Sequence, residues 1–230
     1  MKLLAVDTTE DTCSAALCVD DEMLWRFEIA PRRHSELILP MVDSLLAEAD
    51  LIAQQLDALA FSRGPGSFTG VRIATGVAQG IALGADLPVV PVSTLAALAQ
   101  GAWRTQGARS VLSALDARMG EVYWAYCQLH DGGMVVQGEE QVGKPERLEL
   151  SAQDDWGVGS GWGAYTDVLQ QATGIPMQRI MGEQRIHARD VASLGLVALL
   201  AGQTVAPEQA LPIYIRDNVA VKSVINPTSI

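Results

Sequence analysis

The stretch "KLLAVDTTEDTCSAALCVDDEMLWRFEI", residues 2–29, decides the fold. It contains three strand patterns joined by short turns. The run "LLAV" is continuously apolar, "CSAALCV" is apolar and small, and "MLWRFEI" alternates apolar with polar side chains. Asp7 stands where the first apolar run ends. The pattern predicts a sheet that starts with three strands consecutive in the chain.

The remainder of the first half alternates helices with strands. Residues 34–50 predict a helix with one apolar stripe, residues 57–63 and 87–93 predict strands, and residues 93–103 predict another helix. A further helix lies between the two strands. The order strand-strand-strand-helix-strand-helix-strand-helix is typical of an α/β domain.

The second half begins in the same way as the first. Residues 110–140, "SVLSALDARMGEVYWAYCQLHDGGMVVQGEE", superpose on the N-terminal segment without a gap at a shift of 109 residues, which places Asp7 on Asp116. One aligned aspartate can be coincidence, but the matching order of elements favours a duplicated α/β chain with two βββαβα-type subdomains. We expect subdomains at 1–103 and 104–221, a helix near 190–202 that packs back on the first subdomain, and a tail at 222–230.

This plan resembles the duplicated actin-like ATPase (ASKHA) fold, which includes sugar kinases and Hsp70. In that fold Asp7, Thr8 and Thr9 would form the first phosphate hairpin, and Asp116 would stand at the second. Hydroxyl and backbone N–H groups in such a turn can hold phosphate, and an aspartate can hold Mg²⁺ through water. The alternative is a turn in which Asp7 and Thr9 only bond the local backbone.

The glycine-rich segment "GPGSFTGVR", residues 64–72, lacks the G-K-[ST] of a Walker loop. It follows a predicted strand and opens a helix, where N–H groups favour an anion, unless Ser67 or Thr69 simply caps the helix. Within that helix, Gly76, Gly80 and Gly84 recur every four residues and share one face. Each glycine costs up to ~1 kcal/mol relative to alanine, so we expect close packing there, against either the chain's own sheet or a helix of a second chain.

Composition excludes several classes of protein. The 230 residues carry a net charge of −11, which disfavours direct RNA binding by this chain alone. The three cysteines form no CxxC pair, which fits a reduced, cytoplasmic protein. The three histidines show no metal-binding spacing, no G-x-S-x-G is present, and the longest apolar run, residues 191–202, is too short to span a membrane.

Segments along nearly the whole chain closely resemble the TsaB (YeaZ) family. They are "AVDTT", "HSELILPMV", "LDALAFSRGPGSFTGVRI", "PVSTLAALA", "ALDARMGEVYWA", "GSGW" and "PIYIRDNVA". The resemblance implies a non-catalytic subunit that dimerises with the catalytic relative TsaD, is joined by the ATPase TsaE, and serves the formation of N6-threonylcarbamoyladenosine at position 37 of tRNAs that read codons starting with A. It also implies that tRNA and nucleotide are bound by the complex, with no cofactor on this chain alone.

The resemblance further assigns residues. Thr94 and Leu98 stand where the catalytic relative has its two metal-binding histidines, so the metal site is expected to be lost and Asp7, Thr8, Thr9 and Asp116 to be vestigial. Homodimers and TsaD heterodimers are expected to share one helical surface, and Tyr214 and Arg216 are candidate partner contacts. The candidate dimer residues are Leu37, Met41, Leu45, Ile73, Gly76, Val77, Gly80, Ile81 and Gly84.

Two other classes of function compete with this interpretation. An actin-like small-molecule kinase or ATPase would use Asp7 and Asp116. A metallopeptidase would need ligands that the histidine pattern does not supply.

Overall fold

The computed structural model describes residues 1–148 and 155–216, so the predicted tail 222–230 lies outside the described residues. Within them, two five-stranded sheets have the orders β3-β2-β1-β4-β5 and β10-β9-β6-β7-β8. Read from β8, the second sheet repeats the first, with two antiparallel pairs followed by two parallel pairs. This repetition confirms the duplicated α/β architecture. The strands are β1 (Lys2–Asp7), β2 (Thr12–Val19), β3 (Glu22–Ile29), β4 (Ala58–Ser62), β5 (Val89–Val92), β6 (Ser110–Arg118), β7 (Glu121–His130), β8 (Gly133–Gly143), β9 (Trp156–Val158) and β10 (Ile180–Met181).

Two of the helices begin at serine caps. Ser67 Oγ accepts a hydrogen bond from Gly70 N at 3.0 Å, and Ser93 Oγ accepts one from Ala96 N at 3.2 Å. These bonds satisfy N–H groups that a helix start leaves unpaired. The α-helices are α1 (His34–Glu48), α2 (Phe68–Ala85), α3 (Thr94–Gln106), α4 (Ser160–Thr173) and α5 (Ala188–Leu200), and the 3-10 turns are η1 (Ala53–Gln55), η2 (Pro145–Arg147), η3 (Met177–Arg179) and η4 (Pro207–Gln209).

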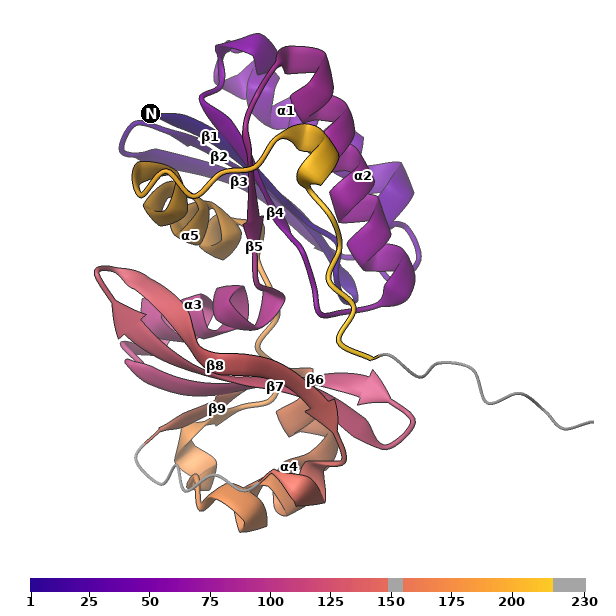
Figure 1. The fold of residues 1–230 in the computed structure, drawn as a ribbon, viewed down its shortest axis with the longest axis vertical. Helices are drawn as coiled ribbons and strands as arrows, with labels where there is room; N and C mark the ends of the chain where they lie inside the picture. The colour runs from indigo at the N-terminus through magenta and orange to yellow at the C-terminus, as the bar shows by residue number, and fades with distance from the viewer. Residues whose placement is uncertain (149–154, 217–230) are drawn as a thin grey trace, which may run out of the picture.

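Two helices are exchanged between the sheets. Helix α3 precedes the second sheet in the chain and packs on β6, β7 and β8, whereas α5 follows that sheet and packs on β1, β2 and β4 of the first. Figure 1 shows α3 and α5 between the two sheets, with α1 and α2 on one outer face and α4 on the other. We call the first sheet with α1, α2 and α5 the first lobe, and the second sheet with α3 and α4 the second lobe.

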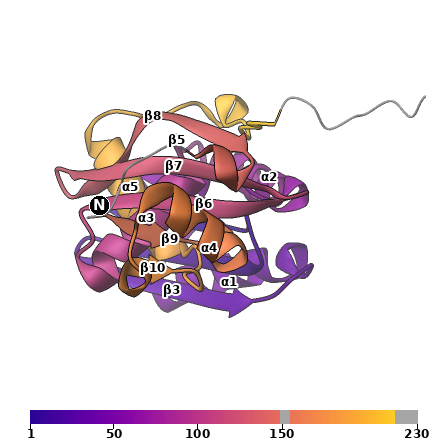
Figure 2. The same cartoon turned by 90° about the horizontal axis from the view of Figure 1, so that it is seen from below.

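The exchanged helices build one shared core. Leu3 of β1, Leu115 of β6, Leu98 of α3 and Val191 of α5 are all buried in the same cluster. Figure 2, seen from below, shows the second lobe in front of the first. The inner faces of both sheets therefore lose their contact with water by packing on the same two helices.

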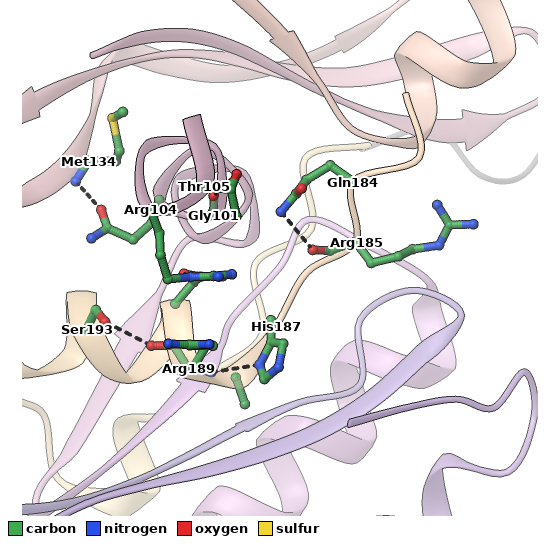
Figure 3. Close-up of polar contacts among 12 residues, drawn as sticks. Gly101, Arg104, Thr105, Met134, Gln184, Arg185, His187, Arg189 and Ser193 are labelled. Atoms are coloured by element: carbon green, nitrogen blue, oxygen red, sulfur yellow. Dashed lines mark hydrogen bonds and ion pairs between the residues drawn. The ribbon is translucent and has the colours of Figure 1, made fainter. Parts of the chain in front are cut away.

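An ion pair joins the exchanged helices at the margin of this core. Arg104 of α3 donates from Nε and Nη2 to the two carboxylate oxygens of Asp190 in α5, at 2.7 and 2.8 Å. Asp190 is 1% exposed, and a Cβ at Gly101 would lie 3.1 Å from its Oδ2. Figure 3 shows Arg104 reaching from α3 toward the start of α5, beside Arg189. The fork-to-carboxylate geometry fixes how α3 lies against α5.

The gap-free superposition of the two halves is off by one residue on the first strand. Leu4 of β1 lies on the outer face of the first sheet, under α1 and α2, and Leu112 of β6 lies on the outer face of the second sheet, under α4. These two residues are therefore equivalent, and they are separated by 108 residues (112 − 4). Ala16 and Ala125 on the second strands both face the shared core, which keeps the shift of 109 (125 − 16). Since a slip of one residue moves every side chain to the opposite face, Asp7 and Asp116 are not structurally equivalent.

A test of this packing compares two Gly→Ala changes. At Gly195 of α5 a Cβ would lie 2.7 Å from Ala60 Cβ in β4, so the helix must move away from the sheet. We expect Gly195→Ala to lower the free energy of unfolding by roughly 1–3 kcal/mol. At Gly76 a Cβ meets nothing within 4 Å, so Gly76→Ala should raise it, by up to ~1 kcal/mol. Denaturant unfolding followed by circular dichroism measures both, and equal stability of the two variants would contradict the close approach of α5.

Candidate functional site

The turn after β1 is tied to the start of α2. Thr8 Oγ1 donates to the carbonyl oxygen of Gly70 at 2.7 Å, and the carbonyl of Thr9 accepts from Ser67 N at 2.7 Å. Thr9 Oγ1 donates to Asp7 Oδ1 at 2.7 Å, and Asp7, Thr8 and Thr9 are all fully buried. Burial raises the pKa of Asp7, and the Thr9 hydroxyl opposes that rise.

The glycines of the "GPGSFTG" loop make this contact possible. A Cβ at Gly66 would lie 2.6 Å from the Thr9 carbonyl oxygen, and one at Gly70 only 2.0 Å from that of Thr8. The loop therefore needs glycine so that the backbone of the Asp7–Thr9 turn can approach the start of the helix. In this conformation the loop holds another part of the same chain.

Asp116 and the Asp7 turn meet where the lobes touch. Ser160, the first residue of α4, donates from Oγ to Glu10 Oε1 at 2.5 Å and accepts from Asp116 N at 3.0 Å. The Asp116 carboxylate itself pairs with Arg118, with 2.9 Å between Oδ2 and Nη1. Glu10 therefore links the turn of the first lobe to the start of α4 in the second.

Glu10 is an unusual acid. Its Oε2 atom is buried and forms no hydrogen bond within the described residues. Burial raises the pKa of Glu10 to about 7, assisted by Asp11 and Asp7 and opposed by Ser160 and Arg185. The bond across the lobes is thus made by a carboxyl group that changes its charge near neutral pH.

The outer surface of α2 is open. Gly76, Gly80 and Gly84 are exposed, and a Cβ at any of them would meet nothing within 4 Å. The sheet is instead contacted by the buried face of the helix, which includes Ala74 and Ala78. The alternative in which the glycine face packs on its own sheet is therefore wrong.

Apolar side chains of α1 and α2 border this open row. Five of the candidate dimer residues are half-buried against the core beneath: Leu37, Met41, Ile73, Val77 and Ile81. Leu45 is a correction, because it is 0% exposed in the core of this chain and offers no surface to a partner. The position of Leu45 in the apolar stripe of α1 does not show whether its side chain is buried in the core or lies at the edge of the stripe.

The two candidate partner contacts in the segment after η4, Tyr214 and Arg216, have different surroundings. Tyr214 is 46% exposed, and its hydroxyl accepts from Arg72 Nε at 2.8 Å. Arg216 forms an ion pair with Glu121 of the second lobe, so its charge is already paired within the chain.

Phe68 lies under the Arg72 guanidinium at 3.6 Å from the ring centroid. The sequence patterns marked neither Phe68 nor Arg72 as an interface residue, although both continue the four-residue spacing of the three glycines toward the helix start.

The histidines serve structural positions. His187 caps α5, where its Nδ1 accepts from Arg189 N at 3.1 Å, and burial lowers its pKa to about 4. His34 is 7% exposed at the start of α1. Among residues 1–148 and 155–216, no group of three or more His, Cys, Asp or Glu side chains is placed to hold a metal ion, and no helix has both the length and the apolar character to cross a membrane.

The matching strand orders, the lobes closed by exchanged helices and the strand-end turns that meet between them define a duplicated actin-like α/β protein. The family model for TsaD, tRNA N6-adenosine threonylcarbamoyltransferase, matches residues 28–223. The chain belongs to the TsaB (YeaZ) family, within the wider group that this model describes.

Similar proteins cover nearly the whole chain. The tRNA threonylcarbamoyladenosine biosynthesis protein TsaB of Escherichia coli is 46% identical, over 96% of this chain and 97% of that protein. TsaB of Haemophilus influenzae is 41% identical, over 96% of each chain. The solved structure of YeaZ from Pseudomonas aeruginosa has a TM-score of 0.85 and 45% identity, and covers 93% of this chain and 99% of that one.

The junction at Glu10 predicts a pH dependence of stability. An acid whose pKa is higher in the folded state than in the unfolded chain binds its proton more tightly when folded. The contribution of Glu10 to the free energy of unfolding should therefore be greatest below about pH 4.5. That contribution should be lost as the pH rises through about 7. Glu10→Gln keeps an acceptor for Ser160 and removes the charge, so its stability relative to the parent should grow between pH 5 and 8.

Thermal unfolding across that pH range measures the effect. Glu22→Gln, at the exposed start of β3, is the matched control for the loss of one carboxylate. If Glu10→Gln tracked the parent at every pH, Glu10 would not titrate in the folded protein near neutrality.

Proposed function

We propose that this chain is a non-catalytic scaffold subunit in the formation of N6-threonylcarbamoyladenosine at position 37 of tRNAs reading ANN codons, and that it acts by dimerising with the catalytic subunit TsaD. Membership of the TsaB family supports the pathway. The open glycine row of α2 carries the proposal of a helical partner.

The row fits a partner for a physical reason. Three glycines on an exposed face weaken an isolated helix, and among the described residues no atom lies within 4 Å of a Cβ placed at any of them. A second helix can lie directly on the backbone there, bordered by the half-buried Ile73 and Val77 of α2 and Met41 of α1. The same surface would serve TsaD or a second copy of this chain.

Two observations support a role without catalysis. Thr94 and Leu98, at the places where the resemblance puts metal-binding histidines in TsaD, are both 0% exposed and belong to the interior. The Asp7–Thr9 turn, which would bind phosphate in an actin-like enzyme, is occupied by contacts with Ser67 and Gly70. In this proposal the complex binds nucleotide and tRNA, TsaE joins it in the cytoplasm, and the chain with its net charge of −11 does not bind tRNA alone.

The proposed interface is tested by Gly80→Leu. A leucine where two backbones meet should cost on the order of 1–3 kcal/mol per copy. In a two-fold dimer both copies carry the change, so the dissociation constant should rise roughly a hundredfold or more. The monomer should remain folded, because leucine favours helix more than glycine and Gly80 borders open space.

Sedimentation velocity and co-purification with TsaD measure the loss of pairing, and circular dichroism checks the fold. Ala164→Leu adds similar bulk at an exposed position of α4 and should leave both assemblies intact. Normal pairing of the Gly80→Leu variant would place the interface elsewhere.

The actin-like kinase or ATPase keeps one supporting observation, the meeting of the Asp7 turn with Asp116 through Ser160. Asp7→Asn distinguishes the two functions, since asparagine keeps an oxygen to accept from Thr9 but removes the charge that would hold Mg²⁺. We expect the variant to support tRNA modification in the reconstituted complex nearly as well as the parent. A loss of several orders of magnitude, with nucleotide turnover by the unmodified chain alone, would favour the enzyme.

A further inference from the structure

An arginine is held in place on the exposed face of α2 and forms no ion pair with any acid of residues 1–148 and 155–216. The Arg72 guanidinium lies 3.6 Å above the centroid of the Phe68 ring, and Nε donates to the Tyr214 hydroxyl at 2.8 Å. Phe68 is 60% exposed and Tyr214 46%. We call these three residues the Arg72 anchor.

The anchor differs from two other arginines that the fold holds in place. Arg104 and Arg216 each pair with a carboxylate, whereas Arg72 makes no ion pair within the described residues. Stacking and the bond to Tyr214 restrict its side chain, while its two Nη groups make no hydrogen bond within residues 1–148 and 155–216. A guanidinium fixed in this way loses little freedom on binding a carboxylate from another molecule.

The same helix carries a matching acid at its other end. Asp86 is the C-cap of α2, exposed, with φ of 55°. It follows Arg72 by 14 residues (86 − 72), about four turns, so both positions lie on nearly the same side of the helix, about 21 Å apart along its axis. Within the described residues Asp86 forms no ion pair.

We propose that the Arg72 anchor binds the carboxylate of the partner's Asp86 in a two-fold pair of this chain. In an antiparallel pair of identical helices, a residue faces its counterpart on the other side of the crossing point. Arg72 and Asp86 are equally distant from residue 79, which lies between Gly76 and Gly80. The alignment that brings Arg72 beside the partner's Asp86 therefore places the crossing point of the two helices next to Gly76 and Gly80, where no side chain projects from the helix.

The inference rests on the proposed function, because it uses the same surface, and it adds what sets the register. Two copies carry −11 each and repel one another at long range. Two symmetric Arg72–Asp86 contacts oppose that repulsion. They can form only when the two α2 helices are antiparallel and cross at residue 79. A shallow crossing, near 20°, keeps both contacts within reach of the arginine side chain.

Charge exchange tests the pair. The dimer dissociation constant is measured by sedimentation at low ionic strength for the full chain, Arg72→Glu, Asp86→Arg and the double variant. Each single variant places like charges together twice and should raise the constant roughly tenfold or more, and the double variant should return it to near the parent value.

Matched controls carry the same changes away from α2. Arg109→Glu is exposed on the second lobe, and Asp131→Arg has the left-handed backbone of Asp86, with φ of 46°. Both should leave the constant within a factor of about two, and circular dichroism should show all variants folded.

The outcomes separate the inference from the proposed function. Weak dimers for both single variants without recovery in the double variant would overturn the pairing, while the Gly80→Leu result would still support the surface. A parent chain that stays monomeric at all accessible concentrations would also overturn it, and co-purification with TsaD would then decide the proposed function separately.

Discussion

The packing of α3 and α5 between the sheets is the constraint on which the rest of the structure depends. Each sheet is hydrophobic on two faces, and its inner face is covered by a helix from the other half of the chain. Gly101 and Gly195 allow these helices to approach their neighbours closely, and Arg104 with Asp190 fixes one against the other. Neither half of the chain can therefore bury the apolar surface of its sheet alone, which makes the two lobes one cooperative unit.

This arrangement divides the molecule into an inner junction and outer faces. At the junction, groups that an actin-like enzyme would present to a nucleotide instead bond to one another, through Thr8, Thr9 and Ser160. On the outside, α1 and α2 cover their sheet with one face and leave the other uncovered. The separate apolar cluster on the outer face of the first sheet supports α1 and α2 from beneath.

The sequence predicted the order of strands and helices along the first half of the chain, and the duplicated plan, because hydrophobic period and repeated element order are local signals. The sequence did not give the correct residue-by-residue alignment of β1 with its equivalent strand β6. A slip of one residue changes the face on which each side chain lies but not the composition of the strand. The helical period identified the glycine face without saying what lies opposite, and it could not separate buried Leu45 from its half-buried neighbours. The Arg72 anchor escaped detection because Tyr214 joins it from 142 residues away. The subdomain limits and the roles of Asp7 and Arg216 stay predictions.

The course of the last described residues has a consequence for handling the protein. After pairing with β5 at Val205, the chain passes Gln79 of α2, reaches Arg72 through Tyr214 and ends its described path at Arg216, bound to Glu121 of the second lobe. A fusion attached directly after Arg216 would therefore stand close to the α2 surface that includes Arg72. The start of β1 lies on the opposite side of the first lobe from α2 (Figure 1), although a tag fused there would replace the Met1 ammonium that pairs with Asp20.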